Sequence, residues 1–157
     1  MSDTTESPAD TSVAKLHLIV GYDGSPPAMR ALDGAVGLLQ GRAGHIHVVY
    51  VAHIPSIDML SADAIVVMEE DFDEVEKELR ASAAAQLDAR GVAWEFHRRQ
   101  GIIVEQLIVA VSAIGDVRPG DTTVIVVGSS SHASHRVVGS VAVGLARHCP
   151  VPLLIVP

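Results

Sequence analysis

The sequence predicts a single α/β domain, a doubly wound parallel sheet of five strands with helices on both faces. Short apolar runs of strand length alternate with longer segments of helical periodicity, in the order βαβαβαβαβ. Each helical segment is long enough for the crossover that joins two parallel strands. Apolar residues make up 48% of the 157 residues and charged residues only 19%, which is sufficient for one buried core.

The first strand is predicted over Leu16–Gly21, an apolar run that ends at a glycine. Ser25 is a candidate N-cap for the next helix, because Pro26 then occupies the first helical position, where its missing N–H costs nothing. Apolar residues at helical spacing continue to Leu39, and Gly41 is expected to end the helix in the left-handed conformation.

A second strand, rich in β-branched residues, is predicted over residues 45–51. After a loop that contains Pro55, a long helix runs to Arg90 and ends at Gly91. Its apolar face has helical spacing: Phe72, Val75, Leu79, Ala83 and Leu87.

The outer surface of this long helix is strongly charged. Asp73 and Lys77 form one expected i,i+4 pair, and Glu76 and Arg80 form another. The acidic run over residues 69–78 is most simply a solvated helix face.

The remaining elements continue the alternation. The third strand, residues 92–99, carries many polar groups, which indicates a position near an edge of the sheet. A third helix over residues 103–114 leads to a fourth strand over residues 122–127. A fourth helix over residues 141–149 and a short strand, Leu153–Val156, complete the domain.

In open parallel sheets, ligands bind beyond the carboxyl ends of the strands. The loops expected at those ends cover residues 22–25, 52–56, 100–102 and 128–140. We expect them to converge on one crevice.

The main candidate site is the small-residue loop before the fourth helix. Gly128 with three serines, and Gly139 with Ser140, combine free backbone N–H groups with a helix start, a pattern that favours a bound anion. The alternative is an ordinary βα loop, since turns are rich in small residues. The loop is not a Walker loop, because no Gly-Lys-Ser/Thr follows, and the sequence has no GxGxxG fingerprint.

Asp23, at the end of the first strand, is the second candidate. Its carboxylate could accept hydrogen bonds from the ribose or base of a nucleotide, or hold a metal. The alternative is a local Asx-type turn that helps Ser25 to start the helix.

The eight histidines show no HExxH or Cys/His ligand spacing, although His45 and His47 share a strand face. Most are therefore predicted to be surface or half-buried groups. His132 and His135 are exceptions, because a cationic imidazole in the serine loop would help to bind a phosphate. Catalytic serine chemistry is not indicated, since no GxSxG elbow is present.

Charge and composition exclude several classes. The formal charge of −8 and the absence of a basic patch argue against a nucleic-acid surface. No span reaches transmembrane length, so no membrane role is expected. Residues 1–14 are polar and acidic, unlike a signal peptide, and are predicted to be a flexible tail before a domain over residues 15–157. The single Cys149 fits a reducing compartment, so a cytoplasmic location is predicted.

Three stretches together resemble the universal stress protein family. They are residues 19–25 (IVGYDGS), the strand segment 48–51, and residues 126–156, which include VVGS, GSVA and PVPLLIV. The resemblance covers nearly all of the chain from Lys15 onward. It implies a sheet with strand order 3-2-1-4-5 and a homodimer paired through the C-terminal edge strand, Leu153–Val156.

The ATP-binding branch of that family has a loop of the form Gly, two residues, Gly, nine residues, then Gly-Ser or Gly-Thr. Gly128 matches the first glycine, and Gly139 with Ser140 matches the last pair. Ser131 stands where the middle glycine belongs, and only seven residues separate it from Gly139. By resemblance, Asp23 lies on the adenine and ribose side, and Val51 offers its backbone to adenine.

The leading hypothesis is a stress-response regulatory protein that binds ATP or a shorter adenine nucleotide, with or without Mg²⁺. The alternative is a dimeric interaction module of the same family without a nucleotide. Enzymatic turnover is not expected; weak ATPase activity or self-phosphorylation through Ser140 stays open, without an identifiable general base. The predicted binding residues are Asp23, Gly24, Ser25, Val51, Gly128, Ser129, Ser130, Ser131, Gly139, Ser140 and Val141.

Overall fold

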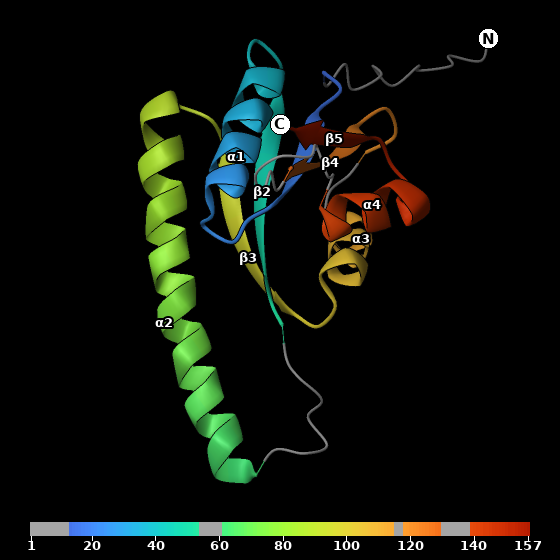
Figure 1. Ribbon diagram of the computed structural model, residues 1–157. Coiled ribbons are helices and arrows are strands. Elements are labelled where there is room, and N and C mark those ends of the chain that lie inside the picture. Colours follow the sequence, from blue (N-terminus) through green and yellow to red (C-terminus); the bar gives the residue numbers. More distant parts are fainter. Residues whose placement is uncertain (1–12, 54–60, 115–117, 130–138) are drawn as a thin grey trace, which may run out of the picture.

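The computed structural model describes residues 13–53, 61–114, 118–129 and 139–157, which form one α/β unit (Figure 1). Five strands pair in parallel in the order β3-β2-β1-β4-β5, which confirms the predicted fold class and strand order. The elements are β1 (Leu16–Gly21), α1 (Pro26–Leu39), β2 (Gly44–Ala52), α2 (Ala62–Leu87), a 3₁₀ turn (Asp88–Arg90), β3 (Trp94–Gln100), α3 (Ile103–Ala113), β4 (Thr122–Gly128), α4 (Ser140–His148) and β5 (Leu153–Val156).

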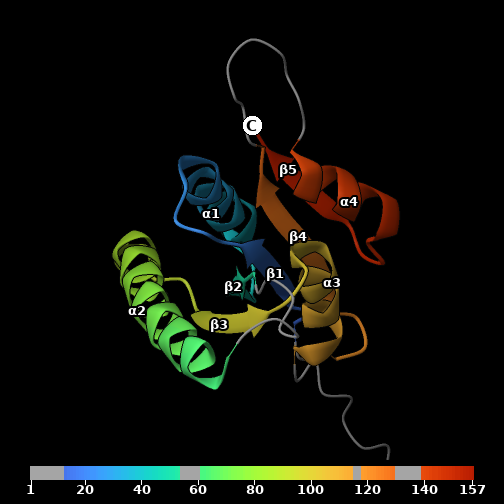
Figure 2. The ribbon, with the colours of Figure 1, turned by 60° about the horizontal axis from the view of Figure 1, so that its bottom comes forward.

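Helices cover both faces of the sheet (Figures 1 and 2). Because side chains alternate along a strand, Leu18 and Val20 of β1 pack into the core beneath α1 and α2. Ile19, between them, packs into the second core with Leu107 of α3 and Leu145 of α4. All five of these side chains are 0% exposed, so both faces of the central strand are fully buried.

The local signals for helix ends act as expected. The Ser25 hydroxyl accepts a hydrogen bond from the Ala28 N–H at 3.4 Å, which caps α1. Gly41 and Gly91 have φ values of 74° and 64°, the left-handed conformation that ends a helix. The third strand begins at Trp94, two residues later than predicted, and lies at the sheet edge as its polarity indicated.

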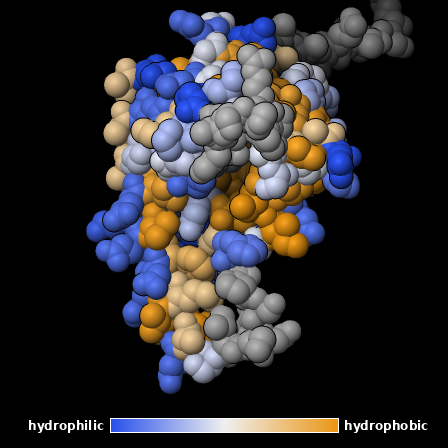
Figure 3. Space-filling model, in the orientation of Figure 1, coloured by the Kyte–Doolittle hydropathy of each residue, from blue (hydrophilic) through white to orange (hydrophobic). Residues whose placement is uncertain are grey.

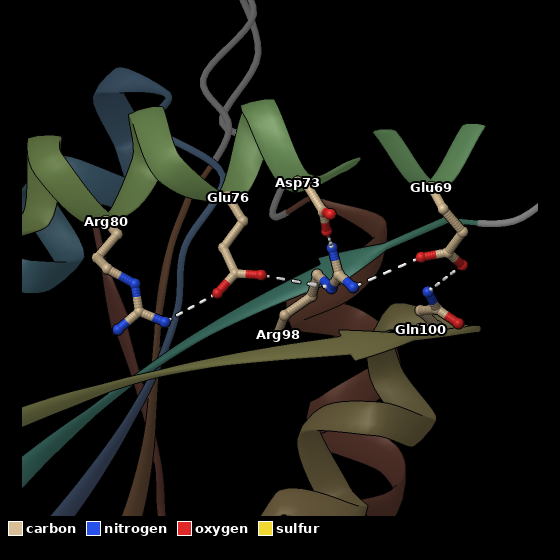
Figure 4. A network of polar contacts seen from close by, with 6 residues as sticks. All are labelled: Glu69, Asp73, Glu76, Arg80, Arg98 and Gln100. Carbon is tan, nitrogen blue, oxygen red and sulfur yellow. Dashed lines mark hydrogen bonds and ion pairs between the residues drawn. The ribbon is translucent and has the colours of Figure 1, made fainter. Parts of the chain in front are cut away.

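The polar residues of β3 bind the acidic run of α2 (Figure 4). Glu76 forms its expected pair with Arg80 at 2.8 Å. Asp73 instead pairs with Arg98 of β3, which also lies 3.5 Å from Glu69 and 3.4 Å from Glu76. The acidic run is therefore not only a solvated face: part of it holds an edge strand, a contact that crosses from one element to another and that helical periodicity alone does not reveal.

The first turns of α2 extend past the sheet (Figure 1). Val66 and Val67 are exposed there, and apolar side chains are visible along this part of the helix (Figure 3). Within the described residues, no helix combines the length and the apolar character needed to cross a membrane.

Candidate functional site

A pocket of about 280 Å³ lies at the carboxyl ends of β1, β2 and β4. From β1 the chain proceeds outward through β2 to β3, and then returns through α3 to β4 on the other side of β1. The connections on the two sides of β1 therefore leave toward opposite faces of the sheet. This reversal leaves the crevice in which ligands of open α/β sheets bind.

One wall of the pocket is apolar. Val49 and Val51 of β2 and Val127 of β4 contribute strand side chains. Ile103 and Leu107, one turn apart on α3, close this side. Such a wall suits a flat, largely apolar group of a ligand.

The amino terminus of α4 forms the opposite, polar side. The N–H groups of Ser140, Val141 and Ala142 lie in the first turn and therefore have no intrahelical acceptor. The N-cap, Gly139, has no side chain that could accept a hydrogen bond from them. All four residues line the pocket, and the first turn contains no acidic residue. N–H groups that the helix itself leaves unbonded, together with the positive end of the helix dipole, favour an anion here.

Asp23 lies on the loop between β1 and α1 and lines the pocket. Its Oδ1 accepts a hydrogen bond from the Ser25 N–H at 3.0 Å, which is the Asx-type turn given as the alternative. The side chain is nevertheless exposed to the pocket, and Oδ2 makes no hydrogen bond to the described part of the chain. The turn therefore positions a carboxylate oxygen that can still accept a bond from a ligand.

Gly128 lines the pocket where β4 ends, but packing already explains why it is a glycine. A Cβ at this position would overlap the backbone carbonyl of Pro27 in the first turn of α1. Close approach of α1 to β4 therefore requires glycine, whether or not a ligand binds.

Two further predicted residues contribute to the fold and do not line the pocket. The Ser129 N–H donates to the Val156 carbonyl at 2.7 Å, and the Ser129 carbonyl accepts from Arg30 Nη2 at 3.4 Å. Gly24 has a φ of 74°, and a Cβ there would meet the side chain of Leu79. Ser130 and Ser131, like His132 and His135, lie outside the described residues.

The structure thus brings most of the predicted residues to one pocket: Asp23, Ser25, Val51, Gly128, Gly139, Ser140 and Val141. Apart from Val51, the residues of the apolar wall were not predicted. The spacing of Ile103 and Leu107 indicates a buried helix face, but it does not indicate that this face reaches the carboxyl end of β2.

Comparison with known proteins gives one family. The model of the universal stress protein family matches residues 16–157. A search of curated protein sequences finds no significant match.

Solved structures show the same fold. Universal stress protein UspA from Lactobacillus plantarum is 18% identical with a TM-score of 0.74, over 93% of this chain and 100% of its own. A universal stress protein in complex with cAMP is 23% identical with a TM-score of 0.63, over 90% of this chain and 97% of its own. The universal stress protein from Archaeoglobus fulgidus in complex with dAMP is 17% identical with a TM-score of 0.57, over 92% and 98%. At these identities the likeness concerns the fold, and the bound nucleotides are those of the relatives.

Proposed function

Because the chain belongs to the universal stress protein family, we propose that it is a stress-response regulatory protein that binds an adenine nucleotide in the pocket at the carboxyl ends of the strands. The observation that carries this proposal is the meeting of the α4 amino terminus and the Asp23 carboxylate in one partly apolar pocket. The complexes of two relatives with cAMP and dAMP support it.

Each part of the nucleotide has a matching surface. The base lies against the apolar wall, near the backbone of Val51. Asp23 accepts a hydrogen bond from the ribose. The first phosphate accepts hydrogen bonds from the N–H groups at the start of α4, where charge-assisted bonds contribute about 1.5–3 kcal/mol each. The ligand is ATP, with Mg²⁺, or an adenine nucleotide with fewer phosphates.

The direct test is calorimetric titration of the protein with AMP, ADP and Mg-ATP. Ser140→Pro removes one N–H at the first helical position without breaking an intrahelical bond. The backbone of Gly139, at φ −56° and ψ 156°, is the conformation that a following proline requires. We expect affinity to fall roughly ten- to a hundredfold, whereas Ser140→Ala, which keeps the N–H, has little effect.

Asp23→Asn tests the ribose side, with Asp71→Asn on the exposed surface of α2 as the charge-matched control. Asp23→Asn should weaken nucleotide binding, and Asp71→Asn should leave it unchanged. If none of the three nucleotides binds the wild-type protein or raises its melting temperature, the nucleotide proposal is wrong. The dimeric interaction module then becomes the better description.

We further propose that the protein is a homodimer paired through β5. This strand lies at the edge of the sheet, and all four of its residues are apolar and only half-buried. The Pro152 and Val156 carbonyls bond to β4, so in a parallel ladder the N–H of Ile155 is directed to the open edge. Ile155→Pro should therefore shift the mass measured by light scattering from dimer to monomer, and an unchanged mass would argue against this interface. A cytoplasmic location remains a prediction.

A further inference from the structure

Histidines from three strands lie side by side on the sheet face that α3 and α4 cover. His17 of β1, His47 of β2 and His97 of β3 form a row across the strands. His17 Nδ1 lies 3.3 Å from His47 Nε2, and His47 Nδ1 lies 3.3 Å from His97 Nε2. The row is diagonal: it starts near the amino end of β1 and reaches the middle of β3, where His97 pairs in register with Val49 of the pocket wall.

Two more residues extend the row into a cluster. His45 precedes His47 by two residues on the same face, and the two ring centroids are 4.6 Å apart. Glu95 stands directly opposite His47 in the β2–β3 register. One ligand atom from each of these three residues lies within 4.8 Å of the others. His97 Nε2 is also 3.5 Å from the Glu95 carboxylate.

The cluster contains a buried nitrogen whose hydrogen-bonding capacity is not used. His45 Nε2 has no hydrogen-bond partner among the described residues, an arrangement that costs stability unless another group satisfies it. His47 is only 6% exposed.

We propose that His45, His47 and Glu95 form a site for a divalent transition-metal cation, for which zinc is the best match. Two imidazoles and one carboxylate are a typical zinc ligand set, with a water or a further side chain as the fourth ligand. Two ligands on a tetrahedral zinc are about 3.3 Å apart, so small side-chain rotations bring these three groups to binding distance.

His17 and His97 then act as positioning residues. Both nitrogens of His47 face a neighbouring imidazole, so the metal replaces one of these contacts and the other continues to orient the ring. His17 is itself held by Asp121, whose Oδ2 lies 3.4 Å from His17 Nε2. The metal would join β2 to the edge strand β3.

The test is titration of untagged, chelator-treated full-length protein with Zn²⁺, in the absence of nucleotide. We expect one zinc ion per chain and a rise in melting temperature with zinc concentration. His45→Gln and Glu95→Gln should each weaken zinc binding at least tenfold. His148→Gln removes an exposed histidine on α4 and serves as the matched control, with unchanged affinity.

Glu95 is the decisive position, because its side chain is 61% exposed and its replacement by glutamine should not disturb folding. Circular dichroism of each variant verifies the fold. Substitution by Co²⁺ gives a second readout, since four-coordinate cobalt has far stronger visible bands than octahedral cobalt. No stoichiometric zinc binding, or equal affinity in wild type, His45→Gln and Glu95→Gln, would overturn the proposal. Because nucleotide is absent, neither outcome depends on the pocket.

Discussion

The two ends of the sheet are polar for different reasons. At the carboxyl ends, loops and a helix start surround a pocket, and the polar groups there include the backbone N–H groups of Ser140, Val141 and Ala142. At the amino ends, the polar groups are side chains of paired strands, such as His17 and His47. The polar groups of a loop and a helix start come from residues that are close together in the sequence. A cluster of strand side chains forms only when the strands pair in a particular register. The first kind can be read from a sequence, and the second requires the fold.

The largest expected effect is on stability, and it tests whether Gly128 at the carboxyl end of β4 is required for packing. Gly128→Ala should lower the free energy of unfolding by about 3 kcal/mol or more, because the new Cβ overlaps the Pro27 backbone. Gly139→Ala should cost less than about 1 kcal/mol, since its φ of −56° suits any residue. Urea denaturation measures both. Equal costs would contradict the packing role of Gly128.

A second experiment tests whether the two ends are independent. Ser140→Pro should weaken nucleotide binding roughly ten- to a hundredfold and leave zinc affinity within about twofold. His45→Gln should do the reverse. Calorimetric titration of each variant with AMP and with Zn²⁺ gives the four values. If either substitution lowers both affinities, the two ends are coupled and the comparison fails.

A third experiment tests whether the contacts of Arg98 hold the edge strand β3, which carries Glu95 and His97, against α2. Arg98→Met should lower the free energy of unfolding by about 1 kcal/mol, because the acidic residues of α2 lose their partner on β3 (Figure 4). Hydrogen exchange should accelerate in β3 more than in β1. Arg42→Met, on the exposed turn before β2, is the control. Similar exchange in both variants would show that the Arg98 contacts do not hold this strand.

The smallest expected effect is the acid sensitivity of the amino end. Backbone N–H groups of Lys15 and Arg118 lower the pKa of Asp121 below its ordinary value of 3.8, and His17 adds to this effect. The unfolded chain therefore takes up this proton first, so the stabilisation is complete above about pH 4 and is lost as the pH falls. Asp121→Asn should flatten the dependence of melting temperature on pH in the acid range. An unchanged slope would contradict this assignment.

The fold was predictable because its signals are local. The capping of α1 by Ser25 and the left-handed Gly41 depend only on neighbouring residues, and the alternation of apolar runs with helical periodicity is read along the chain. The pairing of Asp73 with Arg98 was not predictable, because it depends on how α2 lies over β3. The i,i+4 rule gave Lys77 as its partner, which is wrong.

The candidate site was predictable in part. The helix start at Ser140 and the turn at Asp23 are local features, and both line the pocket. The role of Gly128 depends on a backbone contact with Pro27, about a hundred residues away, which spacing cannot show. The proposed metal site could not be predicted for the same reason. His45 and His47 share a strand face, but Glu95 lies close to them only when β2 and β3 take a particular register.

Ser129 has a consequence for how the two proposed binding events affect each other. Its N–H holds Val156 of β5, while its neighbour Gly128 lines the pocket. If β5 also pairs with a second copy, the two equilibria share one thermodynamic cycle. The factor by which pairing changes nucleotide affinity must then equal the factor by which nucleotide changes pairing. Diluting the protein would then change its apparent nucleotide affinity. The size of that change would give the coupling free energy between dimerisation and nucleotide binding.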